Sequence, residues 1–344
     1  MASPIQSGTF TASPFINQYV NILNEEIKIT LNDDFSEAEF EVVYQIEALK
    51  DGIQIPLLFY ALYYKDQFQI WVDDEPVAFE EVWSSDYSLT DSTFIDFDYL
   101  FAVDSNGYSK QILIEEDSIS GFYITLNDLK FFETDLAKGE HFIKVVYTAS
   151  KWADYSDWVQ QHSFRYALAP AKYWKSFNSL KIVLDASKCD FTLATNLGAP
   201  QKGNIKTVAE WNFDGLPSEY IFLKYQVKTP TLSKILLAIS PLGMTVIFGL
   251  FLTGLHIFGI KKYRLRRPNA KPSVVVILGS LVVPFLILSF HILSYFIIDW
   301  SIGEEASGRH GYMFLVIFLY PLLLPIYWIM MWFIDEKVKM LIAA

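Results

Sequence analysis

The stretch ILLAISPLGMTVIFGLFLTGLHIFGI, residues 235–260, contains no Asp, Glu, Lys or Arg. Two further uncharged apolar runs follow it, at residues 272–298 and 311–334. About 20 helical residues cross a hydrocarbon core of about 30 Å, and each run is longer than that. Three consecutive helices that are apolar on every face are not expected in a soluble protein. The sequence therefore predicts three transmembrane helices in the last third of the chain.

The charges between the runs predict the orientation of these helices. The linker after the second run carries three acidic residues and one Arg. The linker after the first run has no acidic residue and six basic ones: Lys261, Lys262, Arg264, Arg266, Arg267 and Lys271. Short loops rich in Lys and Arg stay in the cytoplasm, so these six are the expected cytoplasmic topology determinants. Residues 1–232 are then extracytoplasmic and the C-terminus is cytoplasmic. The alternative, a cytoplasmic N-terminal region, inverts the charge rule.

The expected subcellular location follows from the start of the chain and from the absence of one motif. An exported domain needs a signal peptide, but MASPIQSG at the start has neither a basic nor an apolar region. We therefore expect a mature form whose signal peptide was removed. No Asn-x-Ser/Thr acceptor occurs, which favours a bacterial envelope over a glycosylating secretory pathway. The expected location is the bacterial inner membrane, with residues 1–232 in the periplasm.

Charge also divides the part before the helices. Residues 1–150 carry 27 acidic and 7 basic side chains, whereas residues 151–232 carry 7 and 10. We expect an acidic extracytoplasmic β-sandwich domain at 1–150 and a membrane-proximal β domain at 151–232, or one domain continuous over both, before the helical region at 233–344. This acidity argues against a nucleic-acid partner. Cys189 is the single cysteine, so the chain forms no internal disulfide.

Period-two hydrophobicity predicts the fold class. EFEVVYQIE at 39–47, QFQIWV at 67–72 and HFIKVVY at 141–147 alternate apolar and polar side chains, as half-buried strands do. Further short strands with turn residues between them indicate mainly β structure, with antiparallel sheets packed as a sandwich. A short helix is expected near 125–138 or 169–177.

No catalytic signature is present. The chain lacks a nucleotide-binding glycine loop, a nucleophile elbow and the spacings of zinc ligands. His256 and His291 fall inside apolar runs, but their depths differ by about 20 Å, so they cannot hold one haem iron within a chain. The sequence predicts no cofactor and no metal, and an enzyme is the less favoured class.

An aromatic segment supplies the candidate partner-binding residues. Trp152, Tyr155 and Trp158 lie in a polar stretch that also holds Asp154 and Asp157. Exposed rings of this kind contact proteins or stack on sugars, whereas inward-facing rings would only pack. Phe164 and Tyr166, which share one face of a predicted strand, are expected in the core instead.

The predicted function is that of a non-enzymatic envelope membrane protein. Its β-sandwich would bind a protein or glycan partner, and its helices would contact the lipid bilayer and anchor the chain or dock it in a membrane complex. A single pass would suffice for tethering alone. One alternative is an accessory subunit of a transport or secretion machine, and another is a membrane-bound hydrolase of an envelope polymer.

Overall fold

The computed structural model describes residues 2–4, 17–52, 55–81, 99–103, 109–114, 123–125, 128–168, 171, 174–268, 270, 273–308 and 310–343. These residues form two compact units. The β unit comprises residues 1–153 and 161–226, and the helical unit comprises residues 154–160 and 227–344. About 37% of the chain is strand. The predicted combination of a sheet-rich region with three long apolar C-terminal helices is therefore confirmed.

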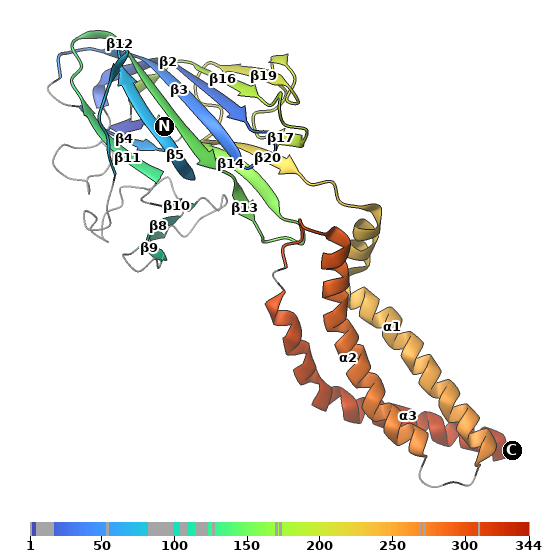
Figure 1. Ribbon diagram of the computed structural model, residues 1–344. Coiled ribbons are helices and arrows are strands. Elements are labelled where there is room, and N and C mark those ends of the chain that lie inside the picture. The colour runs from blue at the N-terminus through green and yellow to red at the C-terminus, as the bar shows by residue number, and fades with distance from the viewer. Residues whose placement is uncertain are drawn as a thin grey trace. The chain divides into compact units, whose positions relative to one another are not determined.

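A nine-stranded sheet is the centre of the β unit, and its longest strands lie side by side in Figure 1. Along it, buried and more exposed residues alternate, as in β3, because one face packs on the core. Its strands, in spatial order, are β18 (Lys202–Gly203), β19 (Val208–Phe213), β16 (Leu180–Asp185), β2 (Asn17–Leu31), β3 (Glu37–Ala48), β12 (Gly139–Ser150), β5 (Tyr64–Val72) and β6 (Glu75–Pro76), with β15 (Trp174–Phe177) paired to β2.

The expectation of purely antiparallel sheets is wrong at β2. This strand pairs antiparallel with β3 but parallel with both β16 and β15, which makes the sheet mixed. Alternation in sequence reports which face of a strand is buried and carries no information on the direction of its neighbour. Residues 129–134 and 174–177, where a short helix was expected, are strands as well.

Three smaller sheets accompany the nine-stranded sheet in the described part of the β unit. Their strands, in spatial order, are β13 (Trp152–Asp154), β14 (Gln161–Ala167), β20 (Tyr220–Gln226) and β17 (Thr192–Thr195); β1 (Ala2–Pro4), β4 (Ile55–Tyr60), β11 (Leu129–Thr134) and β7 (Glu80–Glu81); and β10 (Tyr123–Thr125), β8 (Tyr99–Val103) and β9 (Ser109–Ile114). The described core includes Trp211, Tyr147 and Phe40, all nearly inaccessible to solvent. Phe164 and Tyr166 belong to this core, as the sequence predicts.

The helical unit contains α1 (Thr231–Arg266), α2 (Val274–Ile302), the 3-10 helix η4 (Gly311–Leu319) and α3 (Tyr320–Ala343). Among the described residues, three helical stretches are long and apolar enough to cross a membrane: Thr231–Arg266, Val274–Ile302 and Gly311–Ile342. This confirms the three predicted apolar helices. Their composition indicates association with a membrane and contact with lipid.

The first predicted helix is interrupted, which the sequence analysis did not anticipate. Ser240 has a φ of 64° inside α1, and Pro241 follows it. Proline has no N–H to continue the helix and disfavours helical geometry in the residue before it. The uninterrupted part of α1 is therefore residues 241–266, about 39 Å long, which still suffices to cross a bilayer.

Candidate functional site

Polar side chains inside the apolar helices bond to neighbouring helices, and these contacts are the candidate functional site of the helical unit. They occur at several levels along α1, α2 and α3. In hydrocarbon, an unsatisfied polar group costs several kcal/mol, so such groups are expected to find partners within the protein. The contacts thus report which helix faces pack together.

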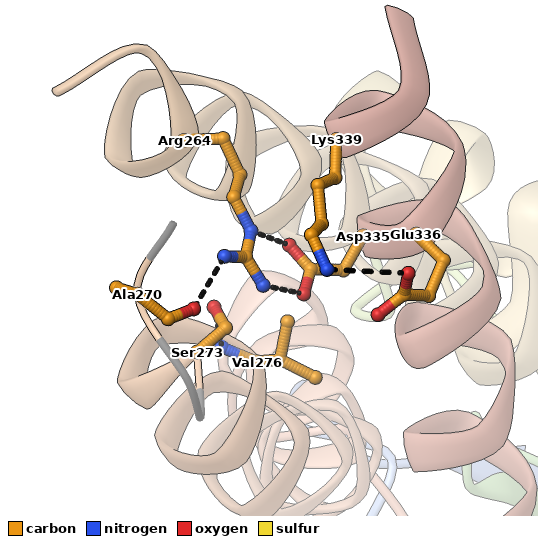
Figure 2. A network of polar contacts seen from close by, with 7 residues as sticks. All are labelled: Arg264, Ala270, Ser273, Val276, Asp335, Glu336 and Lys339. Atoms are coloured by element: carbon orange, nitrogen blue, oxygen red, sulfur yellow. Dashed lines mark hydrogen bonds and ion pairs between the residues drawn. The ribbon is translucent and has the colours of Figure 1, made fainter. Parts of the chain in front are cut away.

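Arg264 and Asp335 form the contact nearest the C-terminal end of α1, shown in Figure 2. Nε of Arg264 donates to Oδ1 of Asp335 at 2.7 Å, and Nη2 donates to Oδ2 at 2.5 Å. Nη1 donates to the carbonyl oxygen of Ala270 at 2.8 Å, so three guanidinium nitrogens have acceptors. The two side chains are only 4% and 3% exposed. This bidentate pair joins the last turn of α1 to α3.

His256 makes the next contact along α1. Its Nε2 lies 3.0 Å from the carbonyl oxygen of Val275, and its Nδ1 lies 3.1 Å from the hydroxyl of Tyr327. A carbonyl can only accept, so Nε2 carries a proton. Gly279 provides the space for this ring, because a Cβ there would lie 2.1 Å from Nε2. One imidazole therefore connects α1 with both other helices.

His291 uses different partners. The hydroxyl of Thr245 donates to the carbonyl oxygen of Pro241 at 2.7 Å, so its lone pair faces Nδ1 of His291 at 2.9 Å. This contact lies just after the break in α1 and joins it to α2. The two histidines of the apolar helices thus have separate sets of partners. Among the described residues, no group of three or more His, Cys, Asp or Glu side chains could hold a metal ion.

Residues 154–160 contribute Trp158 to the helical unit. Its indole stacks on Tyr295 with ring centroids 5.4 Å apart and lies 4.1 Å from the ring of His310. Main-chain hydrogen bonds accompany the stacking: Gln160 N donates to Glu305 O at 2.8 Å, and Ser307 N donates to Trp158 O at 3.0 Å. The predicted partner-binding residue Trp158 therefore has an intramolecular role.

The other two predicted partner-binding residues lie elsewhere. Trp152 belongs to the β unit, where the guanidinium carbon of Arg165 lies 3.5 Å from its ring centroid and Tyr63 packs beside it. Tyr155 belongs to the helical unit and is half-buried. All three rings are partly covered, and partner binding by them stays a prediction.

The six basic residues of the first linker have different environments. Lys261, Lys262, Arg266 and Arg267 are exposed, whereas Arg264 is buried against Asp335. Lys271 lies outside the described residues. Arg264 therefore contributes no free charge, which the sequence analysis missed. The sequence did contain a signal for this pairing, because Arg264 and Asp335 each follow the end of an apolar run on the same predicted side of the membrane.

A second polar cluster, in the core of the β unit, was also missed. Oε1 of Glu25 accepts a hydrogen bond from the hydroxyl of Tyr166 at 2.9 Å, and the hydroxyls of Tyr166 and Tyr44 are 3.0 Å apart. Oε2 of Glu25 has no hydrogen-bond partner among the described residues. Burial raises the pKa of Glu25 to about 7, although the two tyrosine hydrogen bonds favour its charged form. Alternation along β2 could have predicted that Glu25 faces inward, because it lies on the same strand face as the buried Ile27.

Comparison with known proteins does not identify a family. No family model matches the chain, and no curated protein is significantly similar to it. Among solved structures, native yeast LTA4 hydrolase aligns with a TM-score of 0.35 and 8% identity over 64% of this chain and 32% of that one. The zinc metallopeptidase M1 from Deinococcus radiodurans aligns with a TM-score of 0.32 and 9% identity over 65% and 47%. This chain thus matches less than half of either protein, and similarity this low establishes neither a shared fold nor an activity.

Proposed function

We propose that this chain is a non-enzymatic membrane protein of the bacterial envelope. Its β unit, a sandwich on the periplasmic side of the inner membrane, binds a protein or a glycan. Its helices anchor the chain and dock it in a larger membrane complex, and its C-terminus is cytoplasmic. The orientation rests on the excess of Lys and Arg after the first apolar run.

The observation that carries this proposal is the bonding between the helices. Arg264 with Asp335, His256 with Tyr327 and Thr245 with His291 each join two helices. A tether needs one apolar helix and no such contacts. Polar residues in membrane helices that bond to each other favour a preformed helical unit. We infer that this unit presents a defined surface to a partner in the membrane.

The apolar outer surface of the helices supports the same proposal. Large side chains along all three spans are exposed, among them Phe251, Phe285 and Phe318. Gly311–Ile342 is the least buried of the three spans, so it has the largest share of its surface free for contacts outside the chain. This feature also favours the second candidate, an accessory subunit packed on a channel-forming protein.

Isolation from the native membrane tests the proposed docking. We expect a tagged full-length chain, extracted in mild detergent, to retain one or more membrane or envelope proteins in fixed stoichiometry, measured by quantitative mass spectrometry. An unrelated tagged membrane protein at equal abundance is the control and should not retain them. Recovery of the chain alone, after chemical cross-linking in intact cells as well, would contradict docking in a complex.

Cysteine labelling tests the proposed orientation. Cys189 is buried and is first replaced by serine. Lys206 and Pro268 are exposed in the β unit and after α1, respectively, and each is then replaced by cysteine in a separate variant. We expect a membrane-impermeant maleimide to label Lys206→Cys in intact spheroplasts and to label Pro268→Cys only after lysis. The reverse pattern would place the β unit in the cytoplasm.

A further inference from the structure

The end of the helical unit where α1 stops carries a group of exposed cations. Arg264 pairs with Asp335 there, which brings the last turn of α1 next to α3 (Figure 2). Residues 261–268 and 335–343 therefore belong to one end of the unit. Both segments follow an apolar span, so in a membrane they lie at the level of the lipid headgroups.

The internal ion pairs leave a large positive excess at this end. Residues 261–268 and 335–343 contain seven basic and two acidic side chains. Asp335 is neutralised by Arg264, and Glu336 lies 3.8 Å from Lys339. The remaining five cations are exposed: Lys261, Lys262, Arg266, Arg267 and Lys337. Both acidic side chains at this end, Asp335 and Glu336, are therefore paired internally.

Exposed apolar side chains lie among these cations. Leu265 is 61% exposed between Arg264 and Arg266, and Met340 and Leu341 are 63% and 79% exposed after Lys339. Water does not favour such a mixture, but the boundary between headgroups and acyl chains does. Leucine and methionine reach the acyl region, while the long basic side chains extend towards the phosphates.

We propose that this cluster of Lys261, Lys262, Arg266, Arg267 and Lys337 binds the phosphate groups of anionic lipids. Clusters of four to eight Lys or Arg next to a membrane helix attract anionic headgroups. Arg264, held by Asp335, keeps the α1 and α3 cations together so that they act on the same lipids. The proposal does not depend on which side of the membrane this end occupies or on the partner of the β unit.

Lipid binding to the purified full-length chain in mild detergent tests the proposal. The probes are fluorescent phosphatidylglycerol and fluorescent phosphatidylcholine of equal acyl length. We expect phosphatidylglycerol to bind at least about tenfold more tightly, and the preference to shrink as salt is raised, because salt screens exposed charges. Equal affinity for the two lipids would overturn the proposal.

Two charge-matched variants locate the binding site. The first replaces Lys261, Lys262, Arg266 and Arg267 by Gln. The control replaces four exposed lysines of the β unit by Gln: Lys175, Lys188, Lys202 and Lys206. We expect the first variant to lose the preference for phosphatidylglycerol and the control to keep it, with circular dichroism showing that both are folded. Equal preference in both variants would overturn the proposal.

A competition assay separates lipid from free anion. If inorganic phosphate at millimolar concentration displaces phosphatidylglycerol from the wild-type chain, the cluster is a site for the soluble ion, and the lipid proposal fails. We expect no displacement beyond that caused by sodium chloride of equal ionic strength. That result supports a surface that binds several headgroups together with their acyl chains.

Discussion

Replacing Asp335 by alanine is expected to destabilise the helical unit by about 3 kcal/mol or more. The change leaves Arg264 buried with two guanidinium nitrogens that have lost their acceptors. Removing one partner of a buried ion pair costs more than the pair itself contributes, because the remaining charge is desolvated without compensation. Titration of the reconstituted chain with sodium dodecyl sulfate, followed by circular dichroism, measures the free energy of unfolding.

Two further variants separate the charge effect from lost packing. The double variant Arg264→Met, Asp335→Leu removes both charges and is expected to recover most of the stability, because apolar side chains of similar size can replace a buried pair. Glu336→Ala is the matched control, since Glu336 is about half exposed and lies 3.8 Å from Lys339. We expect it to cost less than about 1 kcal/mol. A double variant no more stable than Asp335→Ala would show that the desolvated charge is not the cause.

Acidic solution is expected to stabilise the β unit through Glu25. Its pKa is about 7 in the folded chain, against 4.5 for an ordinary glutamate. Between these pH values the folded state holds a proton that the unfolded state has released, so the free energy of unfolding falls as pH rises. This contribution is fully present below pH 4.5 and is lost as pH passes through about 7. A difference of about 2.5 pKa units corresponds to about 3 kcal/mol.

Glu25→Gln is expected to abolish this pH dependence. Glutamine is uncharged at every pH and can still accept a hydrogen bond from Tyr166, so the variant should exceed wild type at pH 8 by up to about 3 kcal/mol. Hydrogen exchange of β2 and β16 peptides in the full chain, corrected for the intrinsic rate at each pH, measures local stability.

The neighbouring glutamate provides the control for this experiment. Glu26 is partly exposed and pairs with Lys181 at 2.9 Å, so Glu26→Gln should leave the slope with pH nearly unchanged. If Glu25→Gln and wild type lose protection equally between pH 5 and 8, the buried carboxyl is not responsible for the pH dependence of these strands.

Local sequence patterns were sufficient to predict the three apolar helices and the strand β3. Three apolar runs became three helices because their length and lack of charge leave few alternatives to a membrane span. Alternation at 39–47 became β3, with Phe40, Val42 and Tyr44 buried, because side chains on a strand point to opposite faces in turn. Both signals depend only on residues that are close together in the chain.

Contacts between distant residues were decided by the tertiary structure. The parallel pairing of β2 with β16 joins segments about 155 residues apart, and Arg264 reaches Asp335 across 71 residues. Periodicity shows that a residue such as Glu25 faces inward, but not that Tyr166 and Tyr44 meet it there. The sequence by itself determined which apolar runs and which apolar strand faces avoid water. The packing of the elements determined which polar groups meet, because hydrogen bonds and ion pairs require atoms within about 3 Å, and only the folded chain sets those distances.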